Sequence, residues 1–289
     1  MSRSTFALHA LAGILAAALS TALSTPATAQ SLWMQRDGDH TVMLELLRPN
    51  IEGVNSEVLS GAFFLSGRTR VSSGISLVGE LPYLRHASSL WGTDINGYEI
   101  MVDISSKTIG NPYVGMEARL GSGPAFLEVG GRPPLASNEE FYYEEPDAVL
   151  TGFLSDVTRM GAFLPDVASI QAAINLREVT ESKLAYRVRL SPMVAISTDG
   201  GYSDTELFAM YSFQIGYHGS LARVGAGMSG QALVTEDYGN LGNRTRNRFE
   251  IHADFLPGAI RPGLDIQLPF GPEADLVPVV VGASVSWTR

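Results

Sequence analysis

Apolar and polar side chains alternate residue by residue through three consecutive segments between Lys183 and Val234. The segments run over 183–197, 206–218 and 222–234. A period of two residues is typical of a β-strand with one apolar and one polar face. Each segment exceeds the roughly five or six residues of an average strand and reaches the roughly nine to eleven that a tilted strand needs to cross a bilayer. The pattern therefore predicts membrane-spanning strands.

Similar alternation before and after this region predicts about twelve strands in all. The other segments lie near 42–47, 57–66, 75–83, 112–120, 125–132, 168–177, 248–255, 260–268 and 277–288. Connections after the odd-numbered strands are mostly long, whereas those after the even-numbered strands are short. Long loops at one end and short turns at the other are typical of outer-membrane barrels with both chain ends in the periplasm. We therefore expect an all-β fold, a transmembrane antiparallel up-and-down β-barrel.

Two regions fit the alternation less well. Phe64 falls out of step in the second strand, so the facing of that strand is ambiguous, and a turn is expected at Arg68 and Arg70. Residues 86–108 are expected to form a long loop, with Tyr98–Ile104 as an alternative short hairpin inside it.

The longest connection, at 135–166, has two parts. Residues 138–147 are acidic and aromatic, and apolar residues then recur at helical spacing after Pro146, a residue suited to a helix start. The apolar residues are Leu150, Phe153, Leu154, Val157 and Met160. We expect a short amphipathic helix in a long extracellular loop, acting either as a lid on the barrel rim or as a plug folded into the lumen.

The first 29 residues have the features of a secretory signal peptide. Arg3 gives a basic start, residues 6–23 are apolar, and a small-x-small cleavage site ends at Ala29. A retained membrane anchor is the alternative, but the apolar core is short and polar residues follow it at once. We expect cleavage near Ala29, a periplasmic lead-in at 30–40, a barrel at 41–289 and a location in the bacterial outer membrane.

Composition agrees with an exported barrel. The chain has no cysteine, which excludes disulfides and thiolate sites. Its net charge of −10 becomes −11 without Arg3, and this acidic balance argues against nucleic-acid binding. The 30 glycines and 15 prolines suit many strands joined by turns. We expect one large all-β domain and no cofactor.

The polar faces of the strands, gathered into one lumen, would carry many charged side chains. They are Glu117, Arg119, Glu128, Arg132, Arg177, Lys183, Arg187, Arg189, Arg223, Arg248, Glu250, His252, Asp254, Arg261 and Asp265. Such a lining can orient dipolar solutes and select among ions. The alternative is a salt-bridge network that only fills a narrow barrel. We expect solute contact at Arg187, Arg189 and Arg223, which adjacent strands would bring onto one wall. Further candidates for solute contact are Arg177, Arg119, Glu117, Arg248, Glu250 and His252.

Catalysis and metal binding receive less support from the residues. A lipid-hydrolysing barrel needs an outward serine within hydrogen-bond reach of a histidine, and both strand histidines, His218 and His252, are expected to face inward. Residues 37–40 lack the further ligands of a calcium loop, so no metal site is expected. The acidic run at 139–147 is expected to be an exposed loop, with binding of divalent cations that bridge lipopolysaccharide as the alternative.

Three short features also occur in known outer-membrane proteins. They are Gly110-Asn111-Pro112-Tyr113-Val114-Gly115 at a strand start, Leu81-Pro82-Tyr83 at the end of an earlier strand, and Trp287 near the C-terminus. In these features the chain resembles the outer-membrane transporter-like family associated with meta-pathway phenol degradation. Such proteins usually end on an aromatic residue, whereas Thr288 and Arg289 follow Trp287 here. The resemblance implies a diffusion channel or uptake pore for small, often aromatic, molecules.

We therefore expect an outer-membrane channel for passive uptake of small molecules through a charged lumen, and not an enzyme. A lipid-modifying enzyme and a structural or adhesive barrel are the alternatives. The expected partners are outer-membrane lipid and lipopolysaccharide, the barrel-assembly machinery and a small-molecule solute.

Overall fold

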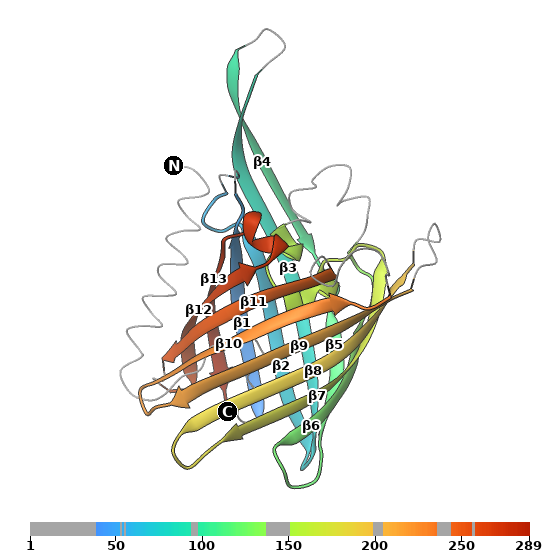
Figure 1. The fold of residues 1–289 in the computed structure, drawn as a ribbon, viewed down its shortest axis with the longest axis vertical. Helices are drawn as coiled ribbons and strands as arrows, with labels where there is room; N and C mark the ends of the chain where they lie inside the picture. The colour runs from blue at the N-terminus through green and yellow to red at the C-terminus, as the bar shows by residue number, and fades with distance from the viewer. Residues whose placement is uncertain are drawn as a thin grey trace.

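The computed structural model of the protein describes residues 39–52, 54, 56–93, 98–136, 151–198, 205–235, 244–255 and 258–289. In this part of the chain, thirteen strands form a single antiparallel sheet that closes into a barrel (Figure 1). The strands are β1 (His40–Asn50), β2 (Gly61–Ser72), β3 (Ile75–Thr93), β4 (Glu99–Ile109), β5 (Tyr113–Arg119), β6 (Ala125–Arg132), β7 (Val167–Val179), β8 (Leu184–Ser197), β9 (Thr205–His218), β10 (Ala222–Leu233), β11 (Thr245–Phe255), β12 (Ile260–Phe270) and β13 (Val279–Thr288). The 3-10 helices η1 (Val157–Ala162) and η3 (Pro272–Asp275) lie in connections between strands.

The wall of the barrel has twelve strand positions. β1 pairs with β13 on one side and with β2 on the other, and β2 also pairs with β3, which closes the ring. β4 and β5 pair with the two halves of β3, so they share one position in the wall. The break between them includes Pro112, which has no N–H group to donate to a ladder. The predicted fold class and strand number are confirmed.

The alternation of the sequence places apolar side chains outside the barrel and polar side chains inside. Among the exposed side chains of the outer face are Val114, Ile170, Leu190 and Leu264. Buried side chains of the inner face include Glu45, Glu80, Glu117, Glu128, Arg189 and Arg248. Phe64, whose facing the sequence left ambiguous, points inward and is fully buried.

The second strand lies further along the chain than the sequence pattern predicts. β2 begins at Gly61, so the predicted start near Glu57 is wrong. Arg68 and Arg70 belong to the strand, and the turn follows at 73–74. These arginines keep the period of two and face a polar lumen, so they continue the strand instead of ending it.

The long loop predicted at 86–108 is also wrong, because β3 continues to Thr93 and pairs with β4. The two strands form a long hairpin that rises beyond the rest of the barrel (Figure 1). Tyr98–Ile104, the alternative hairpin, supplies only one side of it. Ser88 and Ser89 put polar residues at successive positions here, so no apolar face marks the strand, although backbone hydrogen bonds still form.

The two ends of the barrel differ as the parity of the connections predicts. Short connections such as 73–74, 120–124 and 180–183 lie at one end, with the start of β1 and the end of β13. We call this the turn end, and the opposite end, which carries the connection at 133–166, the loop end. The predicted signal peptide and nearly all of the lead-in lie outside the described residues. Among those residues, no helix is long and apolar enough to span a bilayer.

Candidate functional site

The connection between β6 and β7 folds back into the barrel. Its second half, residues 151–166, contains a helical turn at 151–153, an irregular stretch and then η1. We call residues 151–166 the inner loop. η1 packs against the inner sides of β7, β10 and β11. Leu154, Val157 and Met160 are buried there, so this part of the chain occupies space within the lumen.

The single amphipathic helix that the sequence predicts is replaced by two short helical pieces, and the break has a local cause. The Asp156 carboxylate accepts hydrogen bonds from the backbone N–H and the hydroxyl of Thr158, at 2.7 and 2.8 Å, and so caps the start of η1. Burial alone would raise the pKa of Asp156, but the charge of Arg159 and the bonds from Thr158 outweigh burial and lower the pKa. The helix start expected after Pro146, and Leu150, lie outside the described residues.

Arg159 is the centre of the polar contacts between the inner loop and the barrel wall. Its guanidinium donates to Glu45 of β1 and, at 3.2 Å, to Glu80 of β3. It also donates to Asp156 at 2.6 Å, and its carbon lies 3.7 Å from the ring centre of Phe64. Arg159 is only 2% exposed. A buried cation of this kind requires its carboxylates, because an uncompensated buried charge is strongly destabilising.

Two arginines of β11 hold the opposite side of the inner loop. Arg248 donates to the carbonyl oxygens of Leu154 and Ser155, at 2.7 and 2.8 Å. Arg248 also pairs with Glu273 of η3, and Arg246 pairs with the same carboxylate at 2.7 Å. Burial would raise the pKa of Glu273, but the two arginines outweigh burial and lower the pKa. Side chains of the wall thus satisfy buried carbonyl groups of the inner loop.

Asn111, in the break between β4 and β5, is fully buried and binds both ends of the connection. Its amide nitrogen donates to the carbonyl oxygens of Gly161 and Leu164, at 3.1 and 2.7 Å. Its oxygen accepts from the backbone N–H groups of Leu135 and Ala136, at 2.7 and 2.8 Å. Asn111 therefore fixes where the chain leaves the wall and where it returns.

Apolar packing completes the fit of the inner loop. Phe163 packs edge-on against Phe64, with 5.7 Å between ring centres. These rings belong to a buried cluster formed by Leu47, Ile51, Ala62, Phe64, Leu84, Ala136, Leu154, Ala162, Phe163, Val277 and Val280. A second buried cluster is formed by Met160, Met193, Ala195, Phe208 and Met210. Phe153 is partly buried against both clusters. Full burial of one such large side chain contributes about 1.5–3 kcal/mol.

Between the inner loop and the turn end, several predicted lumen residues form ion pairs with one another or with Arg68, which was predicted to lie in a turn. Glu117 of β5 pairs with Arg68 and Arg177, each at 3.0 Å. Glu128 of β6 pairs with Arg189 at 2.8 Å. These contacts have the form of the salt-bridge network that the sequence left as the alternative to solute contact.

The three arginines expected on adjacent strands lie further apart. Arg187 and Arg189 are on β8, whereas Arg223 is on β10, with β9 between them. On β9, Arg223 is paired with His218 and Arg187 is paired with Gln214. Because His218 is nearer to the turn end than Gln214, Arg223 also lies nearer to the turn end than Arg187. The expectation of adjacency is wrong because the three belong to the first and third of three consecutive strands.

The remaining candidates occupy different depths of the lumen. Arg119 is exposed at the turn end of β5. Glu250 of β11 accepts hydrogen bonds from Ser229 and from Gln214, the latter at 3.0 Å. His252 is buried on the same strand. The predicted site residues therefore line the lumen at several levels and do not form one cluster.

Sequence reasoning placed Arg248 in the lumen but missed the other residues that hold the inner loop. Glu45 and Glu80 fall on the polar faces of their strands, so the alternation was sufficient to place them in the lumen. Arg159 interrupts an apolar segment, and a lone charge there indicates a buried partner. Asn111 and Glu273 lie at a strand break and in a loop, where no periodic pattern marks them.

A serine–histidine contact lies inside the barrel, on β3. The His86 ring is 3.0 Å from the Ser88 hydroxyl and 2.9 Å from the Thr151 hydroxyl. Both His86 and Ser88 are buried, so this pair is not the outward-facing pair that a lipid hydrolase would need. The contact instead joins Thr151 of the inner loop to the wall. Within the described ranges, no group of three or more His, Cys, Asp or Glu side chains could hold a metal ion.

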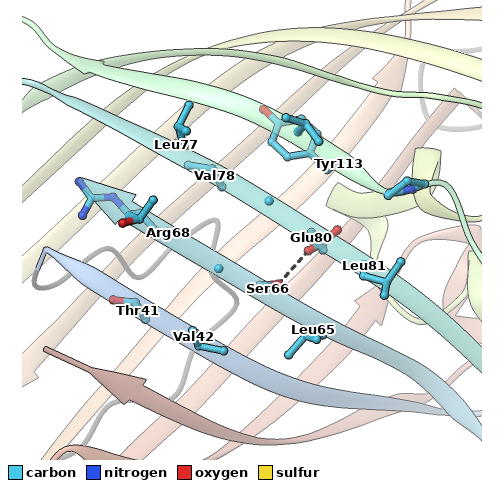
Figure 2. A pocket seen from close by; sticks show the side chains of 15 residues that line it. Thr41, Val42, Leu65, Ser66, Arg68, Leu77, Val78, Glu80, Leu81 and Tyr113 are labelled. Carbon is cyan, nitrogen blue, oxygen red and sulfur yellow. Dashed lines mark hydrogen bonds between the residues drawn. The ribbon is translucent and has the colours of Figure 1, made fainter. Parts of the chain in front are cut away.

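A hollow of about 620 Å³ lies over β1, β2, β3 and β5 (Figure 2). Exposed apolar side chains line it, namely Val42, Leu65, Leu77, Leu81 and Val114. Gly67 and Gly79 are paired across β2 and β3 beneath it, where no side chain fills the surface. Because the apolar lining side chains belong to the outer face, this hollow is part of the outer surface and not of the lumen.

The fold is similar to solved outer-membrane channels. An outer-membrane channel from Pseudomonas putida F1 has a TM-score of 0.57 and 9% identity, over 90% of this chain and 99% of that one. The NanC porin has a TM-score of 0.50 and 9% identity, over 86% of this chain and 100% of that one. No protein-family model and no curated protein matches the sequence. At this identity the likeness shows the barrel fold alone, and the association with phenol degradation stays a prediction.

Proposed function

We propose that the protein is a channel of the bacterial outer membrane for passive uptake of small organic molecules. The observation that carries the proposal is the division of the barrel wall into an apolar outer face and a charged inner face. The solved channels of similar fold support it. The resemblance of the sequence motifs to a transporter-like family adds small aromatic compounds as the first solutes to test.

The outer face supports residence in a membrane. Val114, Ile170 and Leu190 are each more than half exposed, and similar residues cover the wall. Exposed apolar surface costs roughly 25 cal/mol per Å² in water, and soluble monomers rarely expose large contiguous patches. Acyl chains would cover this surface, as in other outer-membrane barrels. The lipid and lipopolysaccharide contacts, the signal peptide and recognition by the assembly machinery belong to the same proposal.

The inner loop is proposed to be the plug of this channel. Leu154 and Val157 are buried within the barrel, and the ion pairs of Arg159 hold the loop to two strands of the wall. Phe153 and Leu150 belong to the same predicted plug, although Leu150 lies outside the described residues. Passage of a solute would then require the inner loop to shift within the lumen.

A liposome-swelling assay with sugars, amino acids and phenolic acids tests the proposal. Arg159→Met keeps an apolar stem over Phe64 but leaves Glu45, Glu80 and Asp156 without this cation. Breaking one buried pair typically costs about 3–5 kcal/mol, so we expect the docked loop to become less populated. Swelling with Arg159→Met should therefore be several-fold faster than with the unmodified protein.

Arg85→Met is the matched control, because Arg85 pairs with Glu57 at 3.1 Å in a partly exposed position outside the lumen. It should leave the swelling rate unchanged. No swelling by any variant would contradict the channel and favour a structural or adhesive barrel. Release of fatty acid from mixed micelles would favour a lipid-modifying enzyme. Equal swelling by the unmodified protein and Arg159→Met would contradict the plug alone.

A further inference from the structure

Inward-facing arginines gather at the turn end of the barrel. β2, β5, β7, β10 and β12 each place one within the first or last three residues of the strand. These five residues are Arg70, Arg119, Arg177, Arg223 and Arg261. Arg68 of β2 and Arg187 of β8 lie one inward-facing position deeper in the barrel. We call the seven arginines together the arginine rim. The rim therefore surrounds one mouth of the lumen on several sides.

Inward-facing carboxylates at this level of the described barrel are fewer than the arginines, since Glu178 faces outward and Glu181 lies in the exposed turn after β7. Glu117 pairs with two members of the rim, each at 3.0 Å. Asp39 pairs with Arg70 at 2.7 Å, and Asp254 adds another carboxylate near the end of β11. The rim thus keeps an excess of positive charge. An excess of one sign in a channel mouth raises the local concentration of ions of the opposite sign.

Two members of the rim are held by an aromatic ring. The guanidinium carbon of Arg177 lies 3.9 Å from the ring centre of Phe126, and that of Arg119 lies 5.2 Å from it. Contact with a ring orients a guanidinium while its N–H edges can still donate. Planar guanidinium groups bind carboxylate and phosphate through paired hydrogen bonds.

Two carboxylates deeper in the lumen carry the opposite charge and would favour cations, in opposition to the arginine rim. Glu250 accepts hydrogen bonds from Ser229 and Gln214, and Asp265 accepts one from Gln267 at 2.8 Å. The other deep carboxylates are matched by arginines, as in the pair of Glu128 with Arg189 and in the contacts of Glu45 and Glu80 with Arg159. The lumen therefore has a positive mouth and, further in, a smaller negative zone.

We propose that the arginine rim makes the channel selective for small organic anions, with carboxylate or phosphate as the recognised group. This inference rests on the proposed channel function. Anions concentrate at the rim and exchange water for guanidinium hydrogen bonds there, whereas cations are repelled. The rim therefore determines which charge passes, and the inner loop determines when the lumen is open.

The test is the reversal potential of the channel in planar bilayers under a KCl gradient. The unmodified protein should prefer chloride to potassium, and the triple variant R119Q/R223Q/R261Q should lose this preference. The triple variant R119K/R223K/R261K keeps the charge and should retain it. Arg85→Gln, which removes an arginine away from the rim, should also retain it. Replacing chloride by benzoate or by phosphate then identifies the preferred anionic group.

The possible failures differ for the two proposals. Cation preference in the unmodified protein, abolished by the double variant E250Q/D265N, would overturn the inference and leave the channel intact. Unchanged anion preference in the glutamine triple variant would also overturn it. A complete lack of conductance, together with no liposome swelling, would instead contradict the channel function on which the inference rests.

Discussion

At Asn111, one amide group connects segments that are distant in the sequence. Its nitrogen donates to carbonyl oxygens of the inner loop, and its oxygen accepts from the N–H groups of Leu135 and Ala136. The neighbouring Gly110 is equally constrained, because a Cβ there would lie 2.2 Å from the carbonyl oxygen of Ala162. The motif that carries the resemblance to known transporters is therefore also the anchor of the inner loop.

Asn111→Asp should release the inner loop without disturbing the barrel wall. A carboxylate keeps the acceptor but replaces the donor, so it would repel the carbonyl oxygens of Gly161 and Leu164. Leaving buried groups unsatisfied costs about 1–3 kcal/mol for each group. We expect faster hydrogen exchange at the amides of 159–166, with unchanged exchange in β8 and β9.

The matched control is Asn247→Asp. The Asn247 oxygen accepts a hydrogen bond from the Tyr211 hydroxyl, and an aspartate oxygen can accept the same bond. It should leave exchange in the inner loop unchanged. Equal exchange in the Asn111 variant and the unmodified protein would contradict the anchoring role of the amide.

At the scale of elements, the inner loop is placed by its contact with β7. A Cβ at Gly161 would lie 3.2 Å from the Ser169 hydroxyl oxygen. The backbone of Gly161 is not in the left-handed conformation, so a residue with a side chain can adopt it without strain. In a disulfide, the Cβ of one cysteine lies about 3 Å from the sulfur of the other, as the bond lengths and angles of the bridge require. The chain contains no native cysteine that could form a competing disulfide with an introduced one.

The double variant G161C/S169C should therefore form a disulfide on mild oxidation. Mass spectrometry of the folded protein in detergent would detect the loss of two hydrogens, which dithiothreitol should reverse. G161C/S286C is the control, since Ser286 is buried on β13 near the turn end and should not reach Gly161. A bridge in the control, or none in G161C/S169C, would contradict the position of η1.

Strands that alternate across the membrane were predictable, because one apolar and one polar face repeat for many residues. β8, β9 and β10 begin and end close to their predicted limits. The outer part of β3 was not predictable, because polar residues occupy successive positions and only backbone pairing defines the strand. The inner loop was predictable as an apolar helical segment, but its break depends on the cap at Asp156. The period of the sequence shows whether a strand residue faces the lumen or the outside of the barrel. The position of residues in connections, such as Arg159, depends on tertiary partners that no local pattern reveals.

At the scale of the whole molecule, the barrel and its contents are separable. The ring of strands closes without help from the inner loop, since β1 pairs with β13 and β2, β2 pairs with β3, and the sheet continues from β3 through β5 to β13. The inner loop contributes packing against Phe64 and Met193, the Arg159 charge that compensates Glu45, and backbone carbonyl oxygens that accept hydrogen bonds from Arg248. Removal of the loop would thus cost stability without removing the fold.

Replacement of residues 137–164 by a short glycine–serine linker should give a protein that still folds as a barrel. Circular dichroism should remain of the sheet type, and electrophoretic mobility should still change on heating. The unfolding midpoint should fall, because Glu45, Glu80 and Arg248 lose partners and the wall loses the apolar packing of the inner loop. Partial recovery by Glu45→Gln in the deleted protein would assign part of the loss to uncompensated charge. A deleted protein that fails to form a sheet would contradict the separation of wall and loop, and an unchanged midpoint would mean that the inner loop contributes no net stability.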